Sequence, residues 1–164
     1  MRKTLFLLCP TDALEVTINR IYKSENYFYT SLGNSFNPNS KTIKHLKEIV
    51  VKNSIKEINF VLSKDNQIVL DAMKGQSFSN IKALQKLHKE INHHKKISEI
   101  TWKTGNTPYL VLSYYLNQKI KELQVNLNKL PVQPVIKGKI YTKHNNMLTN
   151  TYSNLLCLEK FYFN

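Results

Sequence analysis

Apolar and polar positions along the chain follow two periodicities, one typical of buried strands and the other of amphipathic helices. Short apolar runs without helical spacing predict strands at residues 4–9, 27–30, 58–62 and 135–142. Apolar residues at helical spacing predict helices from near Thr11, from an N-cap at Ser40, over 79–96 and over 107–130. Strands that alternate with helices predict an α/β fold, with a mainly parallel central sheet flanked by helices.

Two segments can be interpreted in more than one way. Residues 68–73 begin with β-branched side chains that favour a strand, whereas Leu70, Ala72 and Met73 suit a helix. Residues 151–164 are apolar and aromatic, and form either a C-terminal tail or an additional edge strand. The chain has 164 residues and no internal repeat, so we expect a single domain over 1–164.

The chain is strongly basic, and the positive charge is concentrated in its second half. Lys and Arg number 24 against 11 Asp and Glu, which gives a net charge of +13. Residues 81–164 hold 13 basic and 4 acidic side chains, whereas residues 1–80 hold 11 and 7. Such a balance suits nucleic acid, anionic lipid or an acidic protein partner, and does not distinguish among them.

The densest basic cluster lies in the predicted helix over 79–96. Its lysines are Lys82, Lys86, Lys89, Lys95 and Lys96. Clustered cations are sufficient for phosphate contacts, and the nearby Trp102 could stack on a base. The alternative is a solvated lysine face that reflects an AT-rich genome. The adjacent pair His93-His94 resembles half a metal site, but neighbouring helical residues point about 100° apart, which favours a solvated face.

The cysteine content and the N-terminus bear on the compartment. Cys9 and Cys157 are the only cysteines and form no Cys-x-x-Cys pair, which favours a reducing compartment over a disulfide framework. The apolar run after Arg2 and Lys3 is too short for a signal peptide, and no segment has the length of a membrane span. We therefore expect a cytoplasmic protein without membrane association.

Three short segments resemble the beta-class carbonic anhydrases. Residues 9–14 read Cys-Pro-Thr-Asp-Ala-Leu, where that family has Cys-x-Asp-x-Arg after its first strand. Residues 27–34 end in Gly-Asn, as the family's second strand does in Arg-Asn-x-Gly-Asn. Residues 138–141 read Gly-Lys-Ile-Tyr, similar to the family's late Gly-x-Val-Tyr-Asp. The resemblance implies a carbonic-anhydrase-like core and a homodimer, for which the apolar segment from Tyr152 to Phe163 is a candidate contact.

The same resemblance implies a zinc site that this chain does not match. The family holds zinc with Cys, His and Cys, and places an Asp-Arg pair beside the metal. Here Cys9 matches, but Lys64 stands at the His position and Gln67 at the second Cys position. An ammonium repels a dication, and a Gln amide is a poor zinc ligand. Thr11 and Ala13 stand at the positions of the Asp-Arg pair, with Asp12 one residue out of register.

These departures predict a non-catalytic relative with no metal or other cofactor, because without zinc the bound water loses its lowered pKa. We expect a dimeric binding module, and a former metal pocket of Cys9, Lys64 and Gln67 that could hold a small anion such as bicarbonate, phosphate or a carboxylate. A basic nucleic-acid-associated protein and an active zinc enzyme with relocated ligands are the alternatives.

Overall fold

The fold is built on one five-stranded sheet. The computed structural model describes residues 2–76, 80–101 and 107–152, and at residues 100 and 101 it describes the backbone alone. The strands are β1 (Lys3–Leu8), β2 (Glu25–Thr30), β3 (Glu57–Ser63), β4 (Val135–Thr142) and β5 (Met147–Asn150). Their order is β2-β1-β3-β4-β5. Neighbours among β1 to β4 run parallel, and β5 returns antiparallel to β4. The predicted α/β class and mainly parallel sheet are therefore confirmed.

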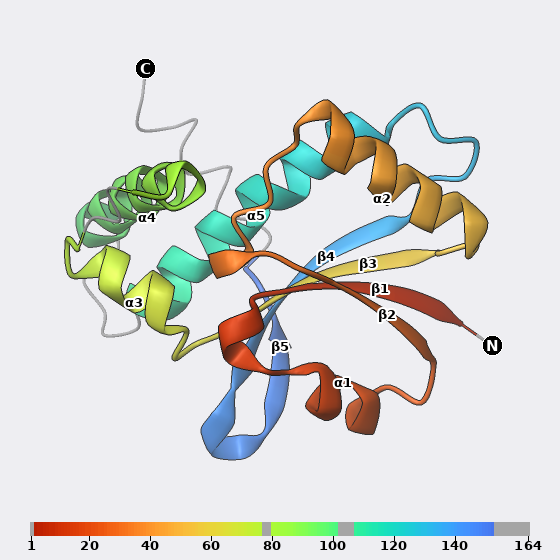
Figure 1. Ribbon diagram of the computed structural model, residues 1–164. Helices are drawn as coiled ribbons and strands as arrows, with labels where there is room; N and C mark the ends of the chain where they lie inside the picture. Colours follow the sequence, from red (N-terminus) through yellow and green to blue (C-terminus); the bar gives the residue numbers. More distant parts are fainter. Residues whose placement is uncertain (1, 77–79, 102–106, 153–164) are drawn as a thin grey trace.

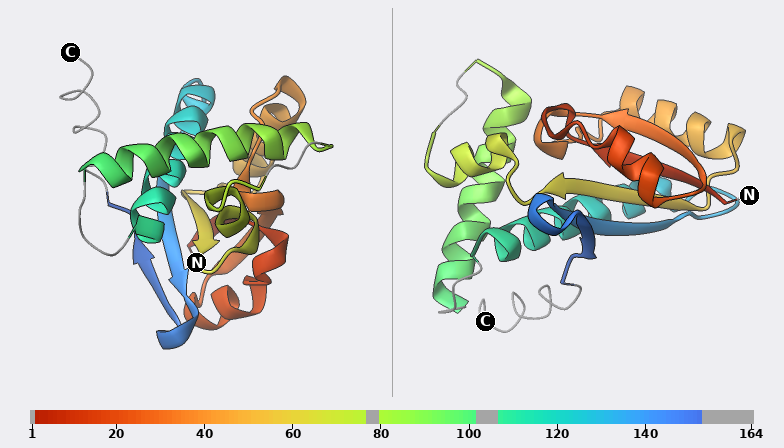
Figure 2. Two further views of the ribbon diagram at one scale, coloured as in Figure 1. Left: turned by 90° about the vertical axis from the view of Figure 1, so that its left-hand side faces the viewer. Right: turned by 90° about the horizontal axis from the view of Figure 1, so that it is seen from below.

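Helices cover both faces of this sheet and the edge where the parallel strands end (Figure 1). They are α1 (Glu15–Ile21), α2 (Ser40–Lys52), α3 (Gln67–Met73), α4 (Lys82–Thr101) and α5 (Thr107–Leu127). In Figures 1 and 2, α2 and α5 lie on one face and α1 on the other. The pair α3 and α4 lies beyond the carboxyl ends of the parallel strands, where α4 crosses α5.

Side chains on the central strands alternate between two apolar clusters, as the period of a strand requires. Leu5 and Leu7 of β1 pack into the larger cluster with residues of α2 and α5, whereas Phe6 and Leu8 pack towards α1. Every residue of β3 is buried, which is expected for a parallel strand covered on both faces. The sequence pattern of β3, apolar on both sides, thus indicated its central position correctly.

Part of the face that carries α1 is charged instead of apolar. Glu57 at the start of β3 is buried and forms ion pairs with Arg2 and with Lys137, whose Nζ lies 3.0 Å from Glu57 Oε2. Asn59 Nδ2 donates a further hydrogen bond to Glu57 Oε1. Burial acts to raise the pKa of Glu57, but these hydrogen bonds and the charges of Lys137 and Arg2 prevail and lower it.

Several boundaries differ from those expected. The N-cap of α2 is Asn39, whose Oδ1 accepts a hydrogen bond from the N–H of Thr42, so the assignment of the cap to Ser40 is wrong. The helix expected from Thr11 is a short 3-10 turn over Pro10–Asp12, followed by α1. Residues 68–73 are helical, because Asn66 caps α3 by accepting from the N–H of Val69.

The described part of the chain ends at Tyr152, next to α5. Tyr152 is half exposed, and its carbonyl accepts a hydrogen bond from Asn117 of α5. Residues 153–164, Cys157 among them, lie outside the described residues, as does Trp102. None of the helices in the described parts of the chain combines the length and the apolar character that crossing a membrane requires.

Candidate functional site

The parallel sheet brings the three residues of the expected pocket to one edge. β1 and β3 are neighbours, with Leu8 in register with Val61. Cys9 directly follows β1 and Lys64 directly follows β3, while Gln67 is the first residue of α3. Ligand sites of open α/β sheets lie at such carboxyl ends of strands.

Cys9 is a buried thiol with two polar neighbours. The backbone N–H of Gly33 donates to Cys9 Sγ across 3.0 Å, and Thr11 Oγ1 lies 3.0 Å from the same sulfur. The residue is 1% exposed, which is typical of a small core side chain. The sulfur that would correspond to a metal ligand therefore already has hydrogen-bonding partners within the chain.

Asp12 joins the loops that follow β1 and β3. Its Oδ2 accepts from the N–H of Ser63 (2.8 Å), and its Oδ1 accepts from Nδ2 of Asn66 (2.9 Å). Burial raises the pKa of Asp12, with Asp65 adding to the rise, although the hydrogen bonds from Ser63 and Asn66 act to lower it. Both carboxylate oxygens thus serve to hold the loop after β3.

Lys64 and Gln67 point to different partners. The backbone N–H of Lys64 donates to the carbonyl of Tyr141, which fixes the turn, and its side chain is half-buried. Its ammonium forms no ion pair with any carboxylate in the part of the chain that the structure describes. Gln67 is exposed, and its Nε2 donates to Asp71 one turn along α3 (2.6 Å). The positive charge of Lys64 is therefore not neutralised by a nearby carboxylate in the described part of the chain.

Gly33 and Asn34 close the site from the side of β2, and both have positive φ angles of 59° and 53°. Asn34 Nδ2 donates to the carbonyls of Leu7 (2.8 Å) and Val61 (3.1 Å), and so ties β1 to β3. A Cβ on Gly33 would lie 2.3 Å from Leu87 Cδ1, so a larger residue would displace the Leu87 side chain of α4 and would also be strained at this positive φ. The Gly-Asn pair noted in the sequence thus has a structural role at the site.

Tyr115 of α5 completes the buried support of this edge. Its hydroxyl donates to the carbonyl of Gly33 across 3.1 Å. Burial, followed by the negative charges of Glu90 and Glu122, raises the pKa of Tyr115 well above its ordinary value. The phenol is therefore a neutral hydrogen-bond donor that positions the Gly33 turn, whose N–H in turn reaches Cys9.

The donor set at this edge does not fit a Cys-His-Cys zinc centre. Lys64 carries a cation, Gln67 bonds to Asp71, and Cys9 Sγ accepts the N–H of Gly33. Among residues 2–76, 80–101 and 107–152, no group of three His, Cys, Asp or Glu side chains is placed to share a metal ion. Sequence reasoning missed Asn66 as a partner of Asp12, because the two are 54 residues apart and only the sheet joins them.

The five lysines of the expected nucleic-acid face all lie on α4, but they differ in their partners. Lys86 Nζ lies 3.5 Å from Glu90 and 3.8 Å from Glu122, and Lys95 Nζ lies 3.7 Å from Glu99. Lys95 also donates to the carbonyl of Met73. The remaining three, which are exposed, are Lys82, Lys89 and Lys96.

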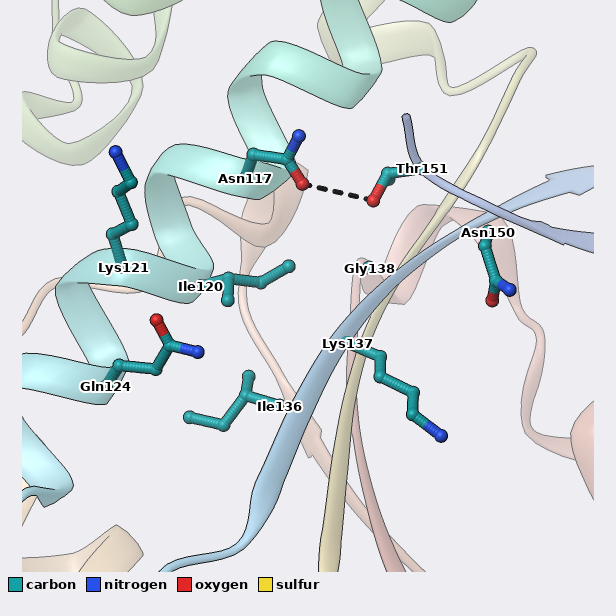
Figure 3. Close-up of a pocket in the computed structure, with 9 residues that line it drawn as sticks. All are labelled: Asn117, Ile120, Lys121, Gln124, Ile136, Lys137, Gly138, Asn150 and Thr151. Carbon is teal, nitrogen blue, oxygen red and sulfur yellow. Dashed lines mark hydrogen bonds between the residues drawn. The ribbon is translucent and has the colours of Figure 1, made fainter. Parts of the chain in front are cut away.

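A separate pocket lies between α5 and β4 (Figure 3). It has a volume of about 430 Å³, with Ile120 and Ile136 forming an apolar part of its wall. Asn117 and Thr151 are joined at one end by a 3.1 Å hydrogen bond, and Lys121 points away from the centre of the group. β3 separates this pocket from β1 in the sheet, so it is distinct from the edge at Cys9.

Comparison with known proteins identifies solved structures with a similar fold. No family model matches the chain, and no curated protein matches it by sequence. Solved beta-carbonic anhydrases do match in structure. The wild-type CafD of the fungus Aspergillus fumigatus superposes with a TM-score of 0.73 at 14% identity, covering 93% of this chain and 90% of that one.

Two further solved structures agree with this assignment. The Coccomyxa beta-carbonic anhydrase in complex with acetazolamide has a TM-score of 0.68 at 8% identity, covering 91% of this chain and 71% of that one. A tetrameric enzyme from Sordaria macrospora has a TM-score of 0.64 at 12% identity, covering 91% and 80%. At such low identity the likeness concerns the backbone arrangement, and we conclude that this chain has the fold of the beta-carbonic anhydrases.

Proposed function

We propose that the protein is a non-catalytic, zinc-free relative of the beta-class carbonic anhydrases that acts as a dimeric binding module. The observation that carries the proposal is the state of the polar groups at the ends of β1 and β3. Asp12 accepts hydrogen bonds from Ser63 and Asn66 with both carboxylate oxygens, and Lys64 stands where the sequence resemblance implies a metal-binding His. Such a set of groups supports holding a negative ligand better than holding a dication.

The proposed ligand is a small anion, bicarbonate, phosphate or a carboxylate, with Lys64 as its charged contact. The exposed amide of Gln67 is close in sequence and offers a second donor once it releases Asp71. Cys9, which is buried, would form the floor of this site. A reducing compartment such as the cytoplasm suits this arrangement, because Cys9 is a free thiol.

Self-association is supported by the likeness to solved carbonic anhydrases, one of which is described as tetrameric. An apolar patch offers a candidate contact. Val51 at the end of α2 is 57% exposed and Val132 before β4 is 67% exposed. They flank a pocket of about 320 Å³ that Pro131 also lines. Exposed apolar side chains around a hollow are typical of a surface covered by a partner.

The test combines metal analysis of protein purified without a metal-affinity tag with a stopped-flow assay of carbon dioxide hydration. We expect no stoichiometric zinc and no rate above that of buffer. Zinc near one ion per chain together with fast hydration would overturn the proposal, and would mean that an active site has been assembled from other ligands.

Anion binding is tested by calorimetric titration with bicarbonate and with phosphate. Lys64→Ala should abolish the binding seen for the wild type, whereas Lys52→Ala, an exposed lysine at the end of α2, should leave it unchanged. Light scattering should give the mass of a dimer for the wild type and of a monomer for Val51→Asp, with Val16→Asp, another exposed valine, as the matched control.

A further inference from the structure

A surface on α4 remains that the proposed anion site does not use. Lys82, Lys89 and Lys96 recur every seven residues, so they lie along one side of the helix. At a rise of about 1.5 Å per residue, neighbouring members of this row are about 10.5 Å apart, and the whole row spans about 21 Å. In the left view of Figure 2, α4 lies across the front of the molecule, away from the sheet.

The ion pairs of α4 distinguish this row from the other lysines. Lys86 and Lys95 are paired with carboxylates. Lys82, Lys89 and Lys96 have no carboxylate within ion-pair distance among the residues that the structure describes. Their charge is therefore not neutralised locally, and it adds to the field of a chain with a net charge of +13.

A hollow lies beside the row. It has a volume of about 480 Å³, and its wall contains the side chains of Lys89, Lys96 and His93. The other lining residues are Gly75, His88 and Asn92, so no acidic side chain is among them. His88 Nδ1 is buried and has no hydrogen-bond partner in the described part of the chain.

We propose that this row, with the adjoining hollow, binds the phosphate backbone of a nucleic acid. A single small anion can contact one or two of the three ammonium groups, because the row spans about 21 Å. A duplex carries one phosphate per about 1.7 Å of its axis, counting both strands, so a row of about 21 Å faces several phosphates at once. Each lysine can then contact a different phosphate. Contacts of this kind carry no sequence information, so the binding should be independent of sequence.

The experiment measures binding of the full-length protein to two labelled duplexes of unrelated sequence by fluorescence anisotropy. The salt concentration is varied between 50 and 200 mM. Three phosphate contacts predict that log K falls against log salt with a slope of roughly −2.7. Lys89→Glu/Lys96→Glu should reduce affinity at least tenfold and bring the slope about two closer to zero. The control Lys41→Glu/Lys44→Glu changes two exposed lysines on α2 and makes the same charge change, so it should reduce affinity less than about threefold.

Three outcomes would overturn this inference: no binding at the lowest salt, an equal loss in both double variants, or binding to anionic vesicles without binding to either duplex. Thermal unfolding of each variant verifies that the fold is retained. Lys64→Ala should bind the duplexes as the wild type does. The nucleic-acid surface and the anion site at Lys64 can therefore succeed or fail separately.

Discussion

Lys119→Met removes a buried cation from the contact between α4 and α5. The side chain of Lys119 is 0% exposed, and its Nζ lies 3.0 Å from Glu90 Oε2 and 3.3 Å from Glu122 Oε2. The ammonium also lies 5.4 Å from the centroid of the Tyr115 ring. The substitution leaves two carboxylates, 11% and 24% exposed, without their closest counter-charge.

The magnitude follows from two opposing effects. Each pair attracts with about 5 kcal/mol at an effective dielectric constant of about 20, but burial of the charges offsets most of this. Removing one partner of a buried pair costs about 3–5 kcal/mol, because the remaining charge is uncompensated. Lys86, which is 54% exposed and lies 3.5 Å from Glu90, supplies partial compensation. We therefore expect the free energy of unfolding to fall by about 3 kcal/mol.

Urea unfolding followed by circular dichroism measures this loss. The matched control is Lys121→Met, an exposed lysine on the same helix, which should change stability by about 0.5 kcal/mol or less. Adding Glu90→Gln and Glu122→Gln to Lys119→Met should recover part of the loss, since no buried carboxylate then lacks a partner. A loss below about 1 kcal/mol, or no recovery in the triple variant, would refute the reasoning.

Three further predictions concern the sheet and the site. Because the pKa of Glu57 is lowered from its ordinary value of 4.5, its ionised form stabilises the fold above that pH, and this contribution is lost as the pH falls through the lower folded pKa. Glu57→Gln should therefore lower the free energy of unfolding at pH 7, and its difference from the wild type should become smaller in acid. For the exposed Glu48→Gln, the difference from the wild type should stay constant with pH. A constant difference for Glu57→Gln as well would contradict this prediction. Gly33→Ala should lower stability by about 2–4 kcal/mol, because of its contact with Leu87 and its positive φ. In thermal unfolding, the double variant Gly33→Ala/Leu87→Ala should lose less stability than the sum of the two single variants. Asn34→Ala should lower stability by about 1–3 kcal/mol, because two buried carbonyls lose their donor. Asn34→Gly removes the same donor and should lower stability by a similar amount. If the Gly variant were as stable as the wild type, the effect of Asn34→Ala would come from the positive φ and not from the hydrogen bonds.

The local pattern of the chain determined most of the elements. The apolar runs at 4–9 and 58–62 identified β1 and β3, because a strand buried on both faces needs apolar residues at consecutive positions. The periodic stretch over 107–130 identified α5 within a few residues of its observed end at Leu127. Short motifs around Cys9 and Gly33 indicated the fold family, although their residues departed from its metal-binding pattern.

The tertiary structure decided what depends on residues distant in sequence. The alternative at 68–73 was settled by Asn66, which caps α3 while it also reaches Asp12 from the loop after β1. Lys119 lies on the apolar side of α5 between Leu116 and Leu123, where an ammonium is unexpected, and the crossing of α4 brings Glu90 to it and allows its burial. Periodicity reports which face of an element is apolar, but it does not report which element will cover that face. Only the parallel register of β1 and β3 brings Cys9, Asp12 and Lys64 to one edge, and that proximity makes the edge a candidate site.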